Sequence, residues 1–264
     1  MKDKPDDQSH KGIGEVTKSV RKSFRNLRTV LHDKYFVRDV DNCPYYNREL
    51  DSFGIMLKGK SLEQFPKYDK EFENCFLVNN FDKELKAIGD SLIGKKCVHF
   101  VNRVKTTTPL QPENYKKLNI TEIQLPKVSA VGDNTLRQSI NHYKSLGLKT
   151  HYLPKHLLKF NNVFGPEYAR KYPNTGILAI IYTLEILRPK TLWIVGLDFY
   201  QSDYLFRRPH QSTIEVQRAK MNRTNLVEIT AAIFQQYPEV DIKMVSYFKG
   251  FPEVQNVTFM DNNI

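Results

Sequence analysis

Short apolar runs alternate with amphipathic segments through most of the chain, and this alternation is the main signal for the fold. Such runs are typical of strands buried on both faces of a parallel sheet. They predict strands at 53–57, 75–78, 98–101, 120–125, 149–153, 192–195, 241–246 and 257–260. Strands separated by helical segments predict an α/β fold with a mostly parallel, doubly wound sheet and helices on both faces.

The strongest pattern lies at 172–204, where a loop precedes an apolar segment, a short apolar run and a second loop. The segment 177–187 is apolar on nearly all sides, which predicts a helix packed inside the domain. Asn174 and Thr175 are residue types that cap helices, and free backbone N–H groups at a helix start attract anions. The loop at 196–200 follows the strand, at the carboxyl end where open α/β sheets bind ligands.

Two further helices are predicted by periodicity and by their terminal residues. One runs over 136–146 and is closed by Gly147. The other begins at a capping box, in which Ser212 is the cap and Glu215 reaches back, and it extends to about residue 236.

The N-terminal part has a different pattern, from which we expect a separate unit at 1–50 before a main domain at 51–264. Apolar residues recur every three or four positions between 11 and 31, with basic residues between them, which predicts a basic amphipathic helix. Two roles are open to this helix. It can pack on the main domain or on a second subunit of a homo-oligomer, which is the commoner fate, or it can lie on an anionic membrane surface.

Composition narrows the class of protein. The 264 residues are 40% hydrophobic, so the chain can bury a substantial core. The formal net charge of +11 suits an anionic partner such as a nucleotide sugar, a nucleic acid or a membrane surface. No nucleic-acid-binding motif accompanies this charge, so we expect no nucleic-acid partner.

The cysteines and the apolar runs bear on the compartment. The three cysteines have no CxxC spacing, so neither a zinc site nor a disulfide framework is indicated, and we expect a reducing, cytoplasmic compartment. No apolar run has the length of a membrane span, and no signal-peptide core is visible.

The segment 172–204 resembles sialyltransferases, chiefly the bacterial enzymes of glycosyltransferase family 42. That family has a Ser/Thr-Gly loop, an apolar helix, and a strand ending in a Gly-Ile-Asp-Phe-Tyr-like segment, here Gly196-Leu197-Asp198-Phe199-Tyr200. Pro173-Asn174-Thr175-Gly176 has a weaker likeness to the Pro-Ser-Thr-Gly start of the animal family 29 enzymes. The resemblance implies a GT-A-like sialyltransferase fold with a lid over the donor near 154–172.

The resemblance implies a metal-independent, inverting transferase without a cofactor. It would move sialic acid, or a related acidic sugar, from a CMP-sugar donor to a hydroxyl of a glycan or glycolipid. No Asp-x-Asp pair stands in a loop suited to a metal, since Asp39-Val40-Asp41 precedes the sheet. The alternative is a transferase-like protein that binds CMP and glycans but has lost catalysis.

The turn after the first predicted strand resembles a phosphate loop. Gly59 and Ser61 match two members of the family's Gly-Asn-Gly-Pro-Ser-Leu turn, and a glycine with a Ser cap is suited to hold a phosphate. Lys58 and Lys60 depart from the family pattern and add two cations near that place. The other interpretation is a solvated lysine turn.

Asparagines and a helix start supply the remaining binding residues that the resemblance implies. The family's two nucleotide-contacting asparagines match Asn79 and Asn102, each at the end of a predicted strand. An Asn amide can donate and accept at once, which suits a base edge or a ribose, although Asn is also common in turns. The donor sugar's carboxylate would meet Asn174, Thr175 and Gly176, where family 42 has Thr-Ser-Gly.

Catalytic residues also follow from the resemblance. In family 42, two tyrosine hydroxyls act on the leaving phosphate. Tyr200 matches the first of these tyrosines, and Tyr204 matches the second approximately. The other interpretation of both residues is aromatic packing at the domain surface. The family's base is a His before the penultimate helix, which makes His210 the candidate, with Glu215 at the His-x4-Glu spacing of the animal enzymes. Aligned from the following strand, that His would fall at 222–224, where there is none, so either the helix is longer or the base is lost.

Overall fold

The computed structural model describes residues 45, 48–101, 109–126, 134–153, 174–201, 204–206 and 223–260. The amphipathic helix expected at 11–31, the lid expected near 154–172 and the capping box at Ser212 lie outside these residues. Among the helices that are described, none is long and apolar enough to cross a membrane.

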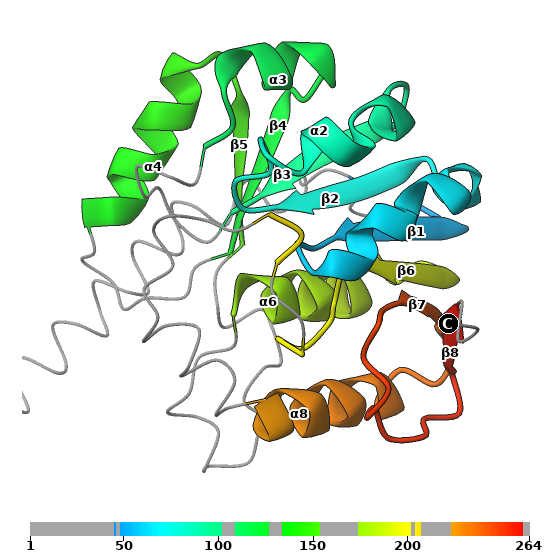
Figure 1. Cartoon of the computed structure of the whole chain (residues 1–264). Helices are drawn as coiled ribbons and strands as arrows, with labels where there is room; N and C mark the ends of the chain where they lie inside the picture. The colour runs from blue at the N-terminus through cyan, green and yellow to red at the C-terminus, as the bar shows by residue number, and fades with distance from the viewer. Residues whose placement is uncertain are drawn as a thin grey trace, which may run out of the picture.

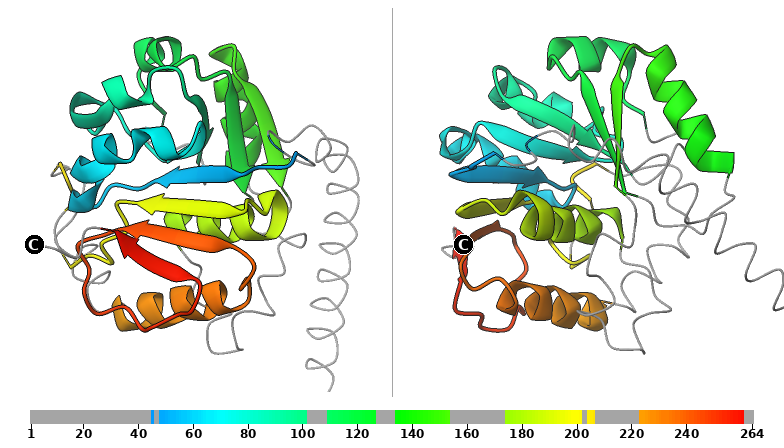
Figure 2. Two further views of the ribbon diagram at one scale, coloured as in Figure 1. Left: turned by 90° about the vertical axis from the view of Figure 1, so that its right-hand side faces the viewer. Right: turned by 180° about the vertical axis from the view of Figure 1, so that it is seen from behind.

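Eight strands form one sheet in the order β5-β4-β3-β2-β1-β6-β7-β8 (Figure 1). Every pair of neighbours is parallel, which confirms the predicted α/β fold with its parallel sheet. The strands are β1 Ser52–Met56, β2 Asn74–Val78, β3 Lys96–Phe100, β4 Glu122–Pro126, β5 Lys149–Leu153, β6 Thr191–Val195, β7 Asp241–Val245 and β8 Val257–Met260. The sheet twists strongly between β8 and β5 (Figure 2).

The strand order reverses at β1. The chain moves outward from β1 to β5, returns to β6 on the other side of β1, and then moves outward again to β8. The connections that leave the carboxyl ends of β1 and β6 therefore run in opposite directions. In open α/β sheets this arrangement produces a crevice between the two strand ends, and ligands bind there.

Helices cover both faces of the sheet. The described helices are η2 Lys60–Lys67, η3 Asp69–Glu71, α2 Leu85–Ile88, η4 Asp90–Leu92, α3 Pro112–Lys117, α4 Asn134–Ser145, α6 Thr175–Tyr182, η6 Thr183–Leu187 and α8 Arg223–Gln235. Side chains of β1 alternate between two apolar clusters: Phe53 and Ile55 pack with residues of α6 and α8, whereas Met56 packs with residues of η2, α2, α3 and α4.

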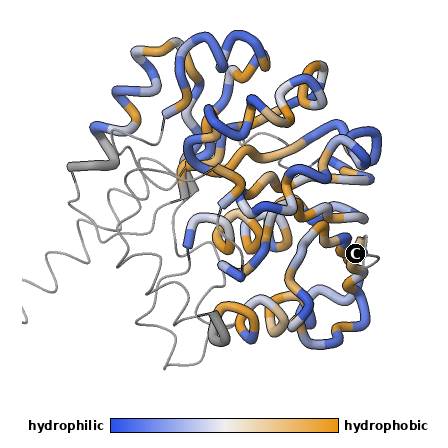
Figure 3. Tube along the Cα trace, viewed as in Figure 1, coloured by the Kyte–Doolittle hydropathy of each residue, from blue (hydrophilic) through white to orange (hydrophobic). Residues whose placement is uncertain are grey.

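Helix α6 lies inside the domain, as its apolar sequence predicts. All six residues from Ile177 to Tyr182 are buried, and Figure 3 shows the hydrophobic positions gathered in this helix and in the strands. The helix continues as the π-helical turn η6 and ends at Arg188, which has a left-handed φ of 49°. This burial fixes the start of α6 beside the carboxyl ends of β1 and β6.

Candidate functional site

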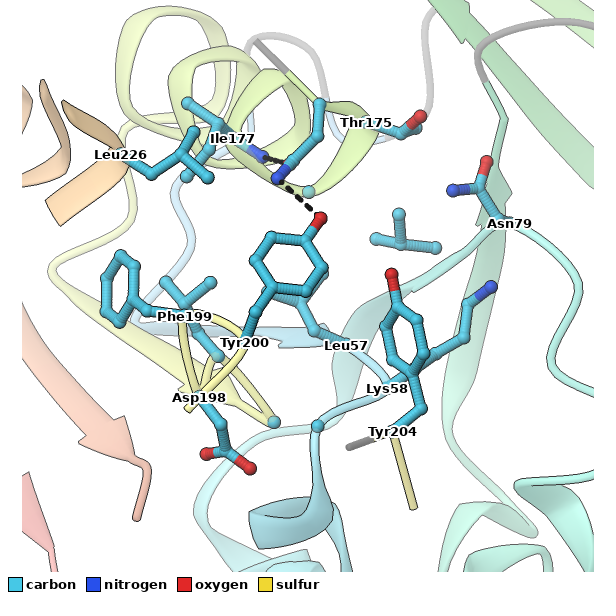
Figure 4. A pocket seen from close by; sticks show the side chains of 16 residues that line it. Leu57, Lys58, Asn79, Thr175, Ile177, Asp198, Phe199, Tyr200, Tyr204 and Leu226 are labelled. Atoms are coloured by element: carbon cyan, nitrogen blue, oxygen red, sulfur yellow. Dashed lines mark hydrogen bonds between the residues drawn. The ribbon is translucent and has the colours of Figure 1, made fainter. Parts of the chain in front are cut away.

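A pocket of about 240 Å³ opens at the carboxyl ends of the central strands, where the strand order reverses (Figure 4). Separate segments line it: Lys58 and Gly59 after β1, Asn79 after β2, the start of α6, the loop at 196–200 after β6, and Tyr204. The structure thus brings together most of the positions that the sequence pattern singled out.

The start of α6 forms one wall. Asn174 is the N-cap, and its side-chain Oδ1 accepts a hydrogen bond from the Ile177 backbone N–H at 3.0 Å. Thr175 and Gly176, the first residues of the helix, line the pocket. A methyl group at Gly176 would lie 3.0 Å from Leu57, so a small residue is favoured there. Backbone N–H groups at a helix start, with the helix dipole behind them, suit an anionic group.

Tyr200 is oriented by the same cap. Because Asn174 Oδ1 accepts from Ile177, its Nδ2 faces the Tyr200 hydroxyl and donates to it at 3.4 Å (Figure 4). A hydroxyl that accepts one hydrogen bond can still donate its own hydrogen to a bound anion. Phe199 and Tyr200 both have left-handed φ values, 45° and 57°, which cost about 1 kcal/mol or more each. Backbone strain of this kind is common at functional sites.

Tyr204 reaches the pocket through backbone pairing with the loop after β1. Tyr204 and Gly59 form an isolated antiparallel bridge, and the Leu205 N–H donates to the Lys58 carbonyl at 2.9 Å. The rings of Tyr200 and Tyr204 meet edge to face, with centroids 6.0 Å apart. In Figure 4 the Tyr204 hydroxyl and the Lys58 amine extend side by side into the pocket.

Asn79 is held by a buried polar chain below it. Asn79 has a left-handed φ of 60°, and its carbonyl accepts from His99 Nε2 at 2.8 Å. With Nε2 protonated, His99 Nδ1 accepts from the Tyr115 hydroxyl at 2.9 Å, and Tyr115 in turn accepts from the Leu110 N–H. Burial lowers the pKa of His99 to about 4, because an apolar environment disfavours the charged ring. His99 is therefore neutral at neutral pH.

Asp198 connects three loops beneath the pocket. Its Oδ2 accepts from the Ser61 backbone N–H at 2.9 Å, and its Oδ1 accepts from the Ser61 hydroxyl, the Ser246 hydroxyl and the Tyr247 N–H. The side chain is buried and points away from the pocket in Figure 4. Asp198 thus fixes the loop that carries Tyr200 against the segments after β1 and β7.

Gly59 and Ser61 have structural partners where the sequence suggested a phosphate loop. The Gly59 N–H donates to the Gly196 carbonyl at 2.9 Å, and Ser61 is fully buried with its N–H and hydroxyl on Asp198. A Cβ at Gly59 would lie 2.6 Å from the Gly196 oxygen. The glycine therefore permits the close approach of the loops after β1 and β6. The Gly59 N–H, the Ser61 N–H and the Ser61 hydroxyl all donate within the protein.

Three predicted features cannot be placed in the pocket, because Asn102, His210 and the lid near 154–172 lie outside the described residues. Two residues that the sequence analysis missed are His99 and, in its connecting role, Asp198. The signal for His99 was a polar residue within an otherwise apolar strand. Within the described part of the chain, no group of three or more His, Cys, Asp and Glu side chains is placed to hold a metal ion.

No protein-family model and no curated protein sequence matches the chain. Two solved structures are similar to it. One is the sialyltransferase CstII from Campylobacter jejuni, solved with the substrate analogue cytidine-5'-monophosphate, at 15% identity and a TM-score of 0.47 over 81% of this chain and 90% of that one. The other is a mammalian sialyltransferase, at 14% identity and a TM-score of 0.44 over 73% of this chain and 68% of that one. At these values function has to be argued from the pocket.

Proposed function

We propose that the protein is a glycosyltransferase of the sialyltransferase type. It moves sialic acid, or a related acidic sugar, from a CMP-sugar donor to a hydroxyl of a glycan or glycolipid, with inversion and without a metal. The observation that supports this best is the convergence, in one pocket, of a helix N-terminus, two tyrosine hydroxyls and an asparagine amide. These groups match the carboxylate, the phosphate and the nucleoside of such a donor.

The donor would lie across the pocket with its nucleotide toward β2. The Asn79 amide contacts the base or ribose, and Asn102 is the second candidate for this contact. The sugar carboxylate accepts hydrogen bonds from the backbone N–H groups at Thr175 and Gly176, where the helix dipole also favours a negative charge. The phosphate then falls between them, near Tyr200 and Tyr204.

Breaking the bond between the anomeric carbon and the phosphate oxygen leaves an oxocarbenium-like sugar and adds negative charge to the phosphate. The hydroxyls of Tyr200 and Tyr204 donate to that phosphate, and their hydrogen bonds strengthen as its charge grows. The acceptor hydroxyl attacks from the opposite face, which inverts the anomeric configuration. Its proton goes to a general base, for which His210 is the candidate.

The test is release of CMP when the protein is incubated with CMP-sialic acid and mixed glycan acceptors, with EDTA and with manganese in parallel. We expect turnover in EDTA and a product of inverted configuration. CMP binding without any turnover would instead identify the inactive binding protein. Turnover only with manganese would remove the metal-free mechanism.

Tyr200→Phe tests the role of the hydroxyl, with Tyr237→Phe as a control outside the pocket lining. Loss of one hydrogen-bond donor to a developing negative charge lowers the rate on the order of 10²-fold. We therefore expect Tyr200→Phe to lower kcat by about this factor with little change in KM, and the control to match the parent. Unchanged turnover in Tyr200→Phe would show that this tyrosine only packs.

A further inference from the structure

We propose that Lys58 binds the phosphate of the donor, so that a side-chain cation stabilises the leaving group in this protein. The inference rests on the proposed function and assigns one more residue to it. Its basis is the juxtaposition, in the pocket, of the Lys58 amine after β1, Asn79 after β2 and the Tyr204 hydroxyl (Figure 4).

The backbone around Lys58 is fixed on both sides. The Leu57 N–H donates to the Val195 carbonyl at 2.8 Å, and the Gly59 N–H donates to the Gly196 carbonyl at 2.9 Å. The Lys58 carbonyl itself accepts from the Leu205 N–H at 2.9 Å. The side chain therefore starts from a defined position, and its amine extends into the pocket beside Tyr204 rather than into the sheet.

The charges that line the pocket favour an anion near Lys58. Among the described lining residues, Lys58 is the only basic side chain and Asp198 the only acidic one. The two carboxylate oxygens of Asp198 accept hydrogen bonds from Ser61, Ser246 and Tyr247, on the side away from the pocket. The negative charge is thereby directed at protein donors, whereas the amine of Lys58 is directed into the pocket.

The pocket has two separate places for negative charge, and a CMP-linked acidic sugar has two negative groups. The start of α6 is one place, and Lys58 with Tyr204 is the other. Because the phosphate joins the nucleoside to the sugar, it must lie between the nucleoside and the carboxylate. In Figure 4 the Lys58 amine lies on the Asn79 side of the pocket, beside Tyr204, whereas the Tyr200 hydroxyl accepts from Asn174 at the start of α6. A phosphate held by Lys58 would therefore adjoin the proposed nucleoside contact.

Lys58 acts without changing its own protonation. As the bond between the anomeric carbon and the phosphate oxygen breaks, its electron pair stays on the phosphate, which changes from a monoanion to a dianion. The acceptor oxygen forms the new bond to the anomeric carbon, and its proton leaves to the general base. A protonated amine stabilises the dianion more than the monoanion, so its contribution increases in the transition state.

Binding of CMP and of cytidine, measured by calorimetry, tests the assignment, because cytidine lacks the phosphate. Lys58→Met removes the charge, Lys58→Arg keeps it, and Lys60→Met is a control at an exposed lysine that does not line the pocket. A hydrogen bond to a charged group is commonly worth about 10- to 100-fold in affinity. We expect Lys58→Met to weaken CMP binding by this factor and to leave cytidine binding unchanged. Lys58→Arg should stay within about threefold of the parent.

Two results would overturn the assignment while leaving the proposed function intact. The first result is that the parent binds CMP and turns over CMP-sialic acid, and that a folded Lys58→Met variant does both equally well. The other is an equal salt dependence of CMP and cytidine binding in the parent, which needs no variant at all, because a phosphate held by a cation must bind more weakly as salt rises. A parent that binds no CMP would instead contradict the proposed function, and the assignment of Lys58 with it.

Discussion

Asp198→Asn is expected to destabilise the protein strongly although it changes few atoms. In the native protein Oδ2 of Asp198 accepts from the Ser61 N–H, and Oδ1 accepts from the Tyr247 N–H and from two serine hydroxyls. An asparagine has only one acceptor oxygen. Whichever way its amide is turned, the NH₂ group faces a backbone N–H, either that of Ser61 or that of Tyr247.

The magnitude follows from this count. One buried backbone donor without an acceptor costs about 1–3 kcal/mol. The remaining hydrogen bonds lose the charge of the carboxylate, which makes them roughly half as strong. Together these effects predict a loss of about 3–4 kcal/mol, a large part of the roughly 5–15 kcal/mol that stabilises a typical domain. Turnover should also fall, because Asp198 fixes the loop that places Tyr200.

Denaturant unfolding of the parent and the variant measures the loss directly. Asp241→Asn is the matched control, because Asp241 is exposed and its ion pair with the half-buried Lys243, at 3.0 Å, is of a kind that contributes little. A second check is the double variant with Ser61→Ala, since residues that share hydrogen bonds give non-additive changes. Two results would show that Asp198 does not hold the loops together. One is that Asp198→Asn lowers the free energy of unfolding by less than about 1 kcal/mol, as in the control. The other is that the losses caused by Asp198→Asn and Ser61→Ala are additive in the double variant.

Two further predictions concern other residues of the site. Asn174→Asp should keep the helix cap and the melting temperature but lower turnover by about tenfold or more. The new carboxylate would repel the acidic sugar donor, and it would accept a hydrogen bond from Tyr200 where the asparagine donates one. Turnover equal to that of the parent would contradict this. For His99, the folded pKa of about 4 lies below the unfolded value of 6.5, so the unfolded chain binds more protons between these values. The contribution of neutral His99 to the free energy of unfolding is complete above pH 6.5, and it falls by roughly 3 kcal/mol as the pH drops to 4. His99→Gln should flatten this part of the curve of unfolding free energy against pH, and an unchanged slope would contradict the assignment.

The fold could be predicted from the sequence because its central strands β1, β2 and β6 are short, apolar and buried on both faces. The predicted strand bounds agree with the observed ones to within two residues, and the helix closed by Gly147 ends there with a left-handed φ of 76°. The π-helical turn η6 was not predictable from periodicity, because the apolar segment 177–187 runs through it with only Thr183 and Glu185 as polar residues. Within α6 and η6, the Thr183 hydroxyl donates to the Ala179 carbonyl, a contact that competes with regular helix geometry.

The site was predictable in its segments but not in its connections. The residues that follow strand ends were identifiable, because parallel strands bring their carboxyl ends to one edge of the sheet. The partners of Ser61 were not, since Asp198 lies 137 positions away and nothing local marks the pair. For the same reason the helix η2 was expected only as a turn: its start depends on this distant carboxylate.

Each side chain that points into the pocket is carried by backbone that a buried contact holds in place. Asp198 holds the loop of Tyr200, and His99 holds the carbonyl of Asn79. The backbone pairing between the segments of Tyr204 and Lys58 holds these two residues. Donors fixed in this way need little reorganisation when charge develops on a ligand, which is how preorganised sites lower a barrier. Substitutions in the pocket should therefore change binding or turnover with little effect on stability. Substitutions in the supporting groups should change both, and this difference separates the two sets of residues by experiment.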